Sequence, residues 1–592
     1  CSSDLITVGD NNPLTDIKYI LNNCNNSVNS SGWDNVNISM LKILPDEQLR
    51  SVAYLISCVL KNGKYLQNFR EIKCMPVYKK GLKNDVKNYR PISVAPTLCN
   101  LTEKVICLQL YHFWENQNLL HRNQYGFRKF HSVGLLVNEV KKYIASKNKK
   151  YCCVLLSDLS NAFGSCDTKI ILSRMAKFFD KNALEVLQSF LIQGTVKVKL
   201  NDEISKPFDT ADRGYPQGSN LSCLTFSILM TLSHLFDNDS EGFSFADDDQ
   251  IVSLGDTIEE LHENSQISLT KFTNFCNDHN IKLNTKKTHF ILIGNQNLYK
   301  NYDFNLVANG DKIEQVKEIN MLGIHLNNHL NYQPHIEHLE NSIKNKCSLI
   351  YNFSKFGNSK TVKTMVQSFC HGKFNHGSAY IPEFTHVEYQ KIQSKINKIC
   401  HLKLTSKIEK MQLGHKLMDQ SELLKRAGLM SIQNLHRLNM MKRLNKILMD
   451  FEPVWEIEEI LLNFTKKTTE NFDFVRNGPK FEIKNNKIAP YIWFEEFNNL
   501  PKILRQKIGS HEFDSNIKIF YKKRCQHKET NDILCFSCTE NLTNYRKHII
   551  DNFTNKFIFY HFKNIKISKF PKFLEERKSK YSIKTSIMRT RL

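Results

Sequence analysis

The 592-residue sequence lacks an apolar run long enough to cross a membrane. Its longest such run, Cys223 to Phe236, is broken by Thr, Ser and His, whereas a transmembrane helix needs about 20 mainly apolar residues. It also lacks a charged-then-apolar secretion signal and an initiator Met, because it opens on Cys1. We therefore predict no membrane span, and we expect that residues upstream of Cys1 are missing.

Disulfide frameworks are excluded as well. The 17 cysteines lie mostly singly, several within apolar runs such as Cys152 and Cys153, in a chain far larger than a disulfide-stapled mini-domain. We predict a reducing, intracellular compartment.

Acidic residues are scarce: 59 Asp and Glu face 82 Lys and Arg, for a net charge of +23. Such a balance indicates a polyanionic partner, nucleic acid before a membrane surface. The competing explanation is an A+T-rich coding sequence, since Asn is abundant and only 17 of the 82 basic residues are Arg. The excess is concentrated in residues 501–592, where 21 basic residues stand against 8 acidic ones.

With 41% hydrophobic and 11% aromatic residues, the chain can form ordinary folded cores, and its length predicts three to four domains. We expect a lead-in segment with one or two helices over 1–60, a mixed region of strands and helices over 61–330, and a helical region over 331–450. A basic C-terminal region over 451–592, interrupted by prolines, has no fold we can assign. No internal repeat is visible.

Within 61–330 the hydrophobic pattern predicts individual elements. Strands are expected over 154–156, 195–200, 242–246, 250–254 and 290–293, and helices over 169–179, 219–236 and 257–279. An acidic turn, Asp247-Asp248-Asp249, should join the third and fourth of these strands.

Carboxylates at strand ends are the most chemically informative feature. Asp158 follows the first buried strand, and Asp247 and Asp248 fall in the predicted turn. Two Mg²⁺ ions held by such hard oxygen ligands can activate a hydroxyl and stabilise leaving pyrophosphate, which is phosphoryl transfer. An isolated Asp pair is weak evidence, because surface turns favour Asp.

Seven motifs in a fixed order strengthen that interpretation. They are Asn88-Tyr89-Arg90-Pro91-Ile92-Ser93, Gln124-Tyr125-Gly126-Phe127-Arg128, Asp158-Leu159-Ser160-Asn161-Ala162-Phe163, Arg213-Gly214-Tyr215-Pro216-Gln217-Gly218-Ser219, Phe245-Ala246-Asp247-Asp248, Leu283-Asn284-Thr285-Lys286-Lys287-Thr288 and Met321-Leu322-Gly323-Ile324. With these motifs, residues 30–350 resemble the reverse transcriptases of non-long-terminal-repeat, LINE-type retrotransposons, most closely jockey-like ones.

The resemblance implies an α+β, right-hand polymerase fold, with fingers and palm (a mixed sheet backed by helices) over 61–330 and a helical thumb after it. It implies that Asp158, Asp247 and Asp248, with the carbonyl of Leu159, hold two Mg²⁺ ions, and that Lys287 is the general acid for leaving pyrophosphate.

Further roles follow from the same resemblance. Arg90 and Arg128 would neutralise the incoming triphosphate, Gln217 and Gly218 would lie near the template and the new base pair, and the Phe163 ring would exclude a ribose 2′-hydroxyl. Each role has a simpler alternative. Arg90 and Arg128 could be ordinary solvated side chains, and residues 214–219 could serve only as a turn and helix cap. Lys287 could be a lysine at a strand edge, and Phe163 could be a core residue.

The sequence departs from the family pattern at Asn161, Gly164 and Tyr215, which suggests a diverged or decaying copy. A third acid, Asp249, is expected to add charge beside the metals.

A separate cluster, Cys525, His527, Cys535 and Cys538, has two close ligand pairs that can close a tetrahedral Zn²⁺ site. Its order and spacing do not match a zinc knuckle, and the alternative is unconnected thiols and an imidazole. In the tail around it, rings such as Phe559 and Phe570 alternate with lysines, a pattern typical of nucleic-acid binding.

We therefore predict an RNA-directed DNA polymerase, with RNA template, DNA primer or target and dNTPs as partners. The upstream endonuclease expected of such an element is absent from this sequence, and the expected location is the nucleus after a cytoplasmic ribonucleoprotein stage. The alternatives are a catalytically silent nucleic-acid-binding protein derived from such an element, or an RNA-copying polymerase that makes RNA.

Overall fold

The structure, a computed structural model, divides into two compact units, residues 1–335 and 336–592, each described here by itself. It describes residues 13–523 except 25–30, 65–70, 118, 177, 180, 193, 210–217, 235, 237, 238, 401–422, 425, 426, 451–488, 490, 501, 506, 507 and 509. No helix of these described residues is long and apolar enough to span a membrane.

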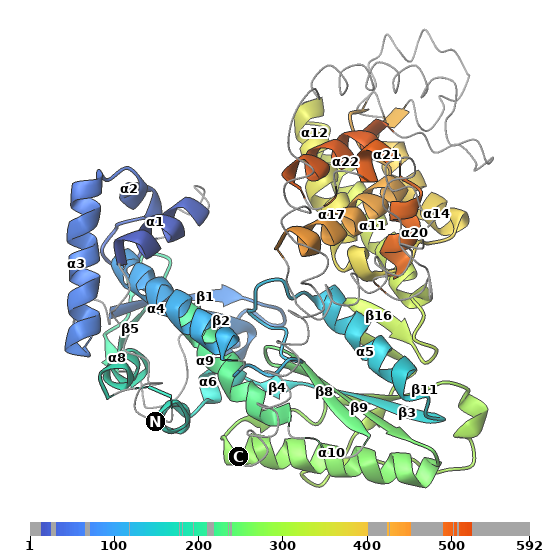
Figure 1. Cartoon of the computed structure of the whole chain (residues 1–592), viewed down its shortest axis with the longest axis horizontal. Coiled ribbons are helices and arrows are strands. Elements are labelled where there is room, and N and C mark those ends of the chain that lie inside the picture. The colour runs from blue at the N-terminus through green and yellow to red at the C-terminus, as the bar shows by residue number, and fades with distance from the viewer. Residues whose placement is uncertain are drawn as a thin grey trace, which may run out of the picture. The chain divides into compact units, whose positions relative to one another are not determined.

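A five-stranded sheet forms the centre of the first unit. Its strand order is β14-β11-β3-β9-β8, with β3 in the middle (Figure 1). The strands are β3 (Tyr151–Ser157), β8 (Ser240–Phe245), β9 (Asp248–Gly255), β11 (His289–Ile293) and β14 (Glu314–Gln315).

Two helices cover this sheet. In Figure 1, α5 (Val133–Lys147) and α10 (Ile258–Asp278) lie on either side of its strands. Thr257 caps α10 by accepting a hydrogen bond from the Glu260 N–H. Because β3 is covered on both faces, its residues form a nearly continuous apolar run, as the sequence indicated.

A second mixed sheet lies beside an N-terminal helical layer. Its strands are β1 (Glu71–Tyr78), β2 (Tyr89–Val94), β5 (Thr195–Leu200), β6 (Glu203–Ile204) and β7 (Phe208–Asp209). Strand β1 pairs antiparallel with β2 and parallel with β5. The helices of this part are α1 (Pro13–Asn23), α2 (Ile38–Lys42), α3 (Asp46–Asn62), α4 (Thr97–Asn116), α6 (Ala162–Ser165), α7 (Thr168–Met175), α8 (Lys181–Ile192) and α9 (Asn220–Met230).

The expected lead-in segment is part of this unit's core, since Ile17, Leu21 and Ile56 are buried together with Val105 of α4. Short two-stranded sheets complete the unit. They are β4 (Leu159–Ser160) with β10 (Lys282–Leu283), β12 (Val307–Ala308) with β13 (Asp311–Lys312), and β15 (Glu318–Met321) with β16 (Ile324–Asn327).

The described part of the second unit is helical. Its helices are α11 (Gln333–Phe353, which begins at the unit boundary), α12 (Ser359–Met365), a π-helical turn (Val366–His371), α13 (Gly372–Asn375), α14 (His386–Ile399), α17 (Ile432–Asp450), α20 (Tyr491–Asn498), α21 (Lys502–Arg505) and α22 (His511–Lys523). Helices α20 and α22 pack against α17, and Phe513, Ile517 and Tyr521 of α22 are fully buried. Elements on both sides of residue 450 thus pack together, and the expected division into a helical region over 331–450 and a basic region over 451–592 stays a prediction.

Most of the predicted elements are present, and three differ. The helix expected over 169–179 ends four residues early, at Met175. The helix expected over 219–236 ends at Met230 and continues as a 3-10 turn over Thr231–His234. The acidic turn was placed wrongly: Phe245 pairs with Asp248, so only Ala246 and Asp247 form the turn. Asp248 and Asp249 are the first residues of β9. Three consecutive Asp residues have the same local preference for a turn, so only the pairing of the strands determines which of them form it.

Candidate functional site

Asp158 lies just after the central strand, and the motif at 283–288 surrounds it. Leu159 pairs with Leu283, which joins β4 to β10. The Asn284 backbone N–H donates to the Asp158 carbonyl at 2.8 Å, and its side-chain amide donates to Asp158 Oδ2 at 3.1 Å. The Lys287 ammonium is 3.2 Å from the same Oδ2. Lys287 and Asn284 thus both contact Asp158. The role of Lys287 as general acid stays a prediction.

The β8–β9 hairpin brings Asp247 and Asp248 to the same end of the sheet as Asp158. Ser157 pairs with Asp249 across β3 and β9, which fixes the register. Ala246 has a φ of 61°, the left-handed conformation that a two-residue hairpin turn requires.

The motif at 124–128 supports this turn from beneath, a role that the sequence did not indicate. The buried Gln124 side chain accepts hydrogen bonds from the N–H groups of Gly126, at 2.9 Å, and Ala246, at 3.2 Å. A Cβ on Gly126 would lie 2.2 Å from the Ala246 nitrogen, so only glycine allows this approach. The one available signal was that this motif precedes the acidic hairpin in the sequence.

The three carboxylates repel one another. Burial first, and then the Asp158 charge, raise the pKa of Asp247. Burial, followed by repulsion from Asp247 and Asp158, raises the pKa of Asp248 to about 6. Concentrated negative charge of this kind is what divalent cations neutralise.

Two cations of the second sheet oppose this charge. Arg90 and Lys79 each lower the pKa of Asp247, which places both within electrostatic reach of the hairpin. Arg90 was predicted to neutralise the incoming triphosphate, and that role stays a prediction. Lys79 was missed, although antiparallel pairing sets Val77 opposite Arg90 and so carries the end of β1 toward the same region.

The donor set suits a hard divalent cation, because carboxylate oxygens are the ligands that Mg²⁺ prefers. Within the described part of the chain, however, no group of three or more His, Cys, Asp or Glu side chains is arranged to hold a metal ion. Asp158 Oδ2 is bonded to Lys287 and Asn284.

Asp249 does not add charge beside the metals, contrary to expectation. It is 3% exposed, and Ser244 Oγ bridges it to His234. His234 Nδ1 donates to the Gly242 carbonyl at 3.0 Å, and burial lowers the pKa of His234 well below its usual value, so Nε2 accepts the single Ser244 proton. Asp249 must then donate to Ser244 as a neutral acid, consistent with burial raising its pKa to about 8.

Arg128 has internal partners. Its side chain is 6% exposed, it forms a two-point ion pair with Glu115 at 2.6 and 2.7 Å, and it donates to the carbonyls of His121 and Gln124. Glu115, in turn, has its pKa lowered by Arg128 although burial opposes this. These contacts tie α4 to the motif at 124–128, and the predicted triphosphate contact of Arg128 stays a prediction.

Phe163 and Gly218 lie in well-defined settings. The Phe163 ring stacks on the buried Phe226 ring at 4.6 Å between centroids and remains partly exposed, which fits both of its predicted roles. Gly218 has a φ of 115°, and a Cβ there would be 2.8 Å from the Ser93 carbonyl oxygen. Gln217 lies outside the described residues.

Two departures from the family pattern belong together. Asn161 has a left-handed φ of 49°, and a Cβ on Gly164 would lie 2.3 Å from the Asn161 amide. A side chain at 164 would therefore require the Asn161 amide to move, so the missing side chain at Gly164 suits Asn161 in this conformation.

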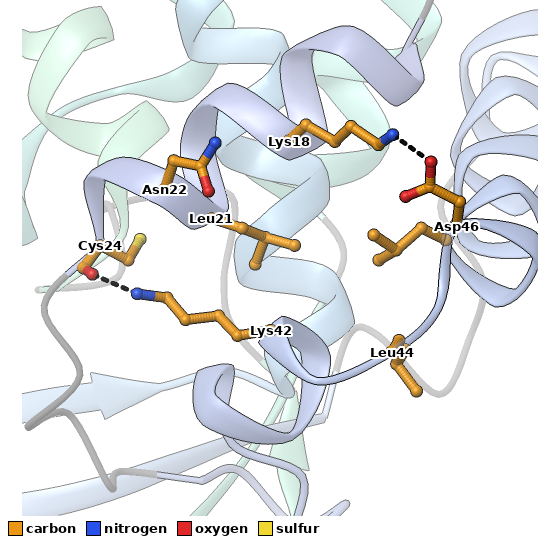
Figure 2. Close-up of a pocket in the computed structure, with 8 residues that line it drawn as sticks. Lys18, Leu21, Asn22, Cys24, Lys42, Leu44 and Asp46 are labelled. Atoms are coloured by element: carbon orange, nitrogen blue, oxygen red, sulfur yellow. Dashed lines mark hydrogen bonds and ion pairs between the residues drawn. The ribbon is translucent and has the colours of Figure 1, made fainter.

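A pocket elsewhere in the unit, drawn in Figure 2, is lined by none of the predicted site residues. It lies among α1, α2 and α3, where Lys18 pairs with Asp46 at 2.6 Å and Lys42 donates to the Cys24 carbonyl at 2.5 Å. Both ammonium groups thus already have protein partners, and we assign the pocket no role in the chemistry.

The proposed zinc ligands Cys525, His527, Cys535 and Cys538 lie outside the described residues, as does the tail from 524 onward. Their zinc site stays a prediction.

Comparison with known proteins gives one family match. Residues 77–326 match the family described as reverse transcriptase (RNA-dependent DNA polymerase). The chain is similar to the probable RNA-directed DNA polymerase from transposon BS of Drosophila melanogaster, with 26% identity over 318 residues, covering 52% of this chain and 35% of that protein. It is also similar to the RNA-directed DNA polymerase from mobile element jockey of the same organism, with 24% identity over 327 residues, covering 54% and 35%.

The chain therefore spans about a third of the length of these curated relatives. Among solved structures it is similar to apo telomerase from Candida tropicalis, with 11% identity, a TM-score of 0.35, and coverage of 67% of this chain and 68% of that one.

Proposed function

Because residues 77–326 are a LINE-type reverse transcriptase domain with a right-hand polymerase fold, we propose that the chain is the RNA-directed DNA polymerase of a retrotransposon. It adds deoxynucleotides to a primer 3′-hydroxyl on an RNA template. The observation that carries this proposal is the gathering of Asp158, Asp247 and Asp248 at one end of the central sheet, which the pairing of β3 with β9 and of β8 with β9 sets. Arg90 and Lys79 each lower the pKa of Asp247 there.

Each residue has a role in this proposal. Asp158, Asp247, Asp248 and the carbonyl of Leu159 would hold two Mg²⁺ ions, which, when bound, activate the primer hydroxyl and stabilise charge on the leaving pyrophosphate. Arg90 and Lys79 bind the triphosphate of the incoming nucleotide, because both are cations whose charge lowers the pKa of Asp247.

Lys287 donates a proton to the departing pyrophosphate, and its position 3.2 Å from Asp158 Oδ2 supports this role. Phe163 excludes ribonucleotides, and Gly218, with Gln217, contacts the template and the nascent pair.

The partners follow from the reaction: an RNA template, a DNA primer or target and dNTPs. In the complete element we expect an endonuclease to supply the nick that provides the primer. Copying onto chromosomal DNA requires the nucleus, and translation and assembly with RNA require a cytoplasmic ribonucleoprotein stage.

Primer extension on a defined RNA template tests this function. The purified chain is given a DNA primer, Mg²⁺ and either dNTPs or rNTPs, and products are sized on a gel. We expect extension to the template end with dNTPs, no extension in EDTA, and little with rNTPs. Extension with rNTPs alone would indicate an RNA-making polymerase, and RNA binding without extension would indicate a silent binding protein.

A further inference from the structure

A buried carboxyl group joins α4 to the start of α9. Glu103 is 1% exposed, and its Oε2 accepts hydrogen bonds from the Ser219 hydroxyl at 2.7 Å and from the Asn220 N–H at 3.2 Å. The Cys99 thiol lies 3.6 Å from Oε1. Among the described residues, the groups that shift the pKa of this carboxyl include no Lys or Arg. Buried acids without a cation are costly, so its retention here calls for a specific function.

The helix start that Glu103 holds is also fixed from the other side. Ser219 caps α9 by accepting from the Ser222 N–H while it donates to Glu103. The preceding residue, Gly218, approaches the Ser93 carbonyl of β2 so closely that no side chain fits. Strand β2 also carries Arg90. The segment 218–220 therefore contacts β2 through Gly218 and α4 through Ser219 and Asn220.

We propose that Glu103 is a positioning residue for the incoming nucleotide. The carboxylate of Glu103 holds the first turn of α9 and the Gly218 backbone against β2. The inference rests on the proposed function, in which Gly218 lies at the nascent base pair. Glu103 touches no substrate in this account. It acts through Ser219 and Asn220.

The protonation of Glu103 gives this role a pH dependence. Burial raises the pKa of Glu103 to about 7, although the bonds from Ser219, Cys99 and Asn220 oppose the shift. The other titratable groups facing it are the thiols of Cys99, Cys107 and Cys223, whose pKa values burial raises, so they stay neutral. The ionised carboxylate accepts stronger hydrogen bonds from the Ser219 hydroxyl and the Asn220 N–H than the neutral acid does. These two bonds to the start of α9 therefore strengthen as the pH rises through about 7.

Stability has the opposite sign. A raised pKa in the folded state means that the contribution of Glu103 to stability is present below its unfolded value of about 4.5 and is lost as the pH rises through about 7. A residue that only supported the fold would weaken structure and nucleotide binding together, whereas a positioning carboxylate improves binding while it costs stability.

The test compares Glu103→Gln with wild type in primer extension between pH 6 and 8. Since hydrogen bonds to charged groups are among the stronger ones, we expect the KM for dNTP at pH 8 to rise about tenfold and kcat to change less than about threefold. The KM should fall with pH in wild type and stay flat in the variant. Thr102→Val, at the neighbouring buried position, removes only a hydrogen bond from the Thr102 hydroxyl to the Leu98 carbonyl within α4, so it should keep the KM of wild type and its pH dependence.

Hydrogen exchange at the Asn220 amide gives a readout that needs no activity. Protection, corrected for the intrinsic rate, should increase from pH 6 to 8 in wild type and be low and flat in Glu103→Gln, with Ser219→Ala intermediate. Equal protection and equal KM in wild type and Glu103→Gln would overturn the inference. If wild type extends no primer, the proposed function fails, and the exchange result still decides whether Glu103 holds the helix start.

Discussion

Asp249 shows at the scale of one residue how neighbours determine the state of a carboxyl group. Its sequence neighbours suggested a third charge at the end of the sheet that carries Asp158. The chain of hydrogen bonds from the Gly242 carbonyl through His234 and Ser244, however, requires Asp249 to be a neutral acid. No sequence pattern could indicate this, because His234 and Asp249 meet only through the pairing of β8 with β9.

Asp249→Asn should therefore be well tolerated, because the asparagine amide can donate to Ser244 Oγ as the neutral acid does. We expect the melting temperature to stay within about 3 °C of wild type. Asp249→Ala should lower it further, since the Ser244 hydroxyl loses its partner in a buried site. Thermal unfolding monitored by circular dichroism measures both, and a large loss in the Asn variant would mean that Asp249 is ionised.

Phe163→Val tests the sugar gate. Removing the ring opens space beside the 2′ position, so we expect the preference for dNTP over rNTP, measured as a ratio of kcat/KM values, to fall about tenfold or more. The ring also stacks on Phe226, so some stability should be lost as well. A less stable variant with unchanged discrimination would show that Phe163 serves only in packing.

At the scale of elements, regular hydrophobic patterns predicted what local sequence can specify. Strand β5 was predicted with its observed bounds, and α10 within one residue at each end. The position of the β8–β9 turn was not predictable, because register is set by pairing with β3 rather than by turn preference. The support of that turn by Gln124 was likewise not predictable from local sequence, since Gln124 and Ala246 are 122 positions apart.

Gln124→Ala tests this support. The Ala246 N–H would lose its buried acceptor, which should loosen the turn that carries Asp247. We expect kcat for extension to fall at least about tenfold, a loss of the size that one buried hydrogen bond provides, with RNA affinity unchanged. Gln296→Ala, which removes bonds to the carbonyls of Leu292 and Gly294, is the matched control. Equal kcat in the two variants would show that Gln124 does not support the turn that carries Asp247.

At the scale of the whole molecule, sequence order and spatial order differ. The motifs containing Arg90, Gln124, Asp158, Asp247 and Lys287 are spread over about 200 residues, and only the resemblance to a family predicted that they would meet. Lys79 lies outside every quoted motif, which explains why it was missed. The residues from 451 onward show less periodicity than those before them, and we assigned them no fold, yet α20 and α22 pack into the helical unit.

The basic tail gives a prediction at this scale. Because α22 is built into the helical unit, a truncation after residue 523 removes 15 basic and 6 acidic residues while it keeps Phe513, Ile517 and Tyr521. We expect the slope of log affinity for RNA on log salt to flatten by several units, at about 0.7 to 0.9 per lost phosphate contact. An unchanged slope would attribute the charge of the tail to coding bias.

Primer extension by Asp247→Asn tests the central claim most directly. Replacing this carboxylate removes a charged metal ligand but leaves the basic surface, so extension should fall at least about a thousandfold while RNA affinity stays within about twofold. Asp256→Asn, at an exposed acid paired with Lys149, should extend as wild type does. Normal extension by Asp247→Asn would contradict the assignment of the acidic hairpin as the polymerase centre.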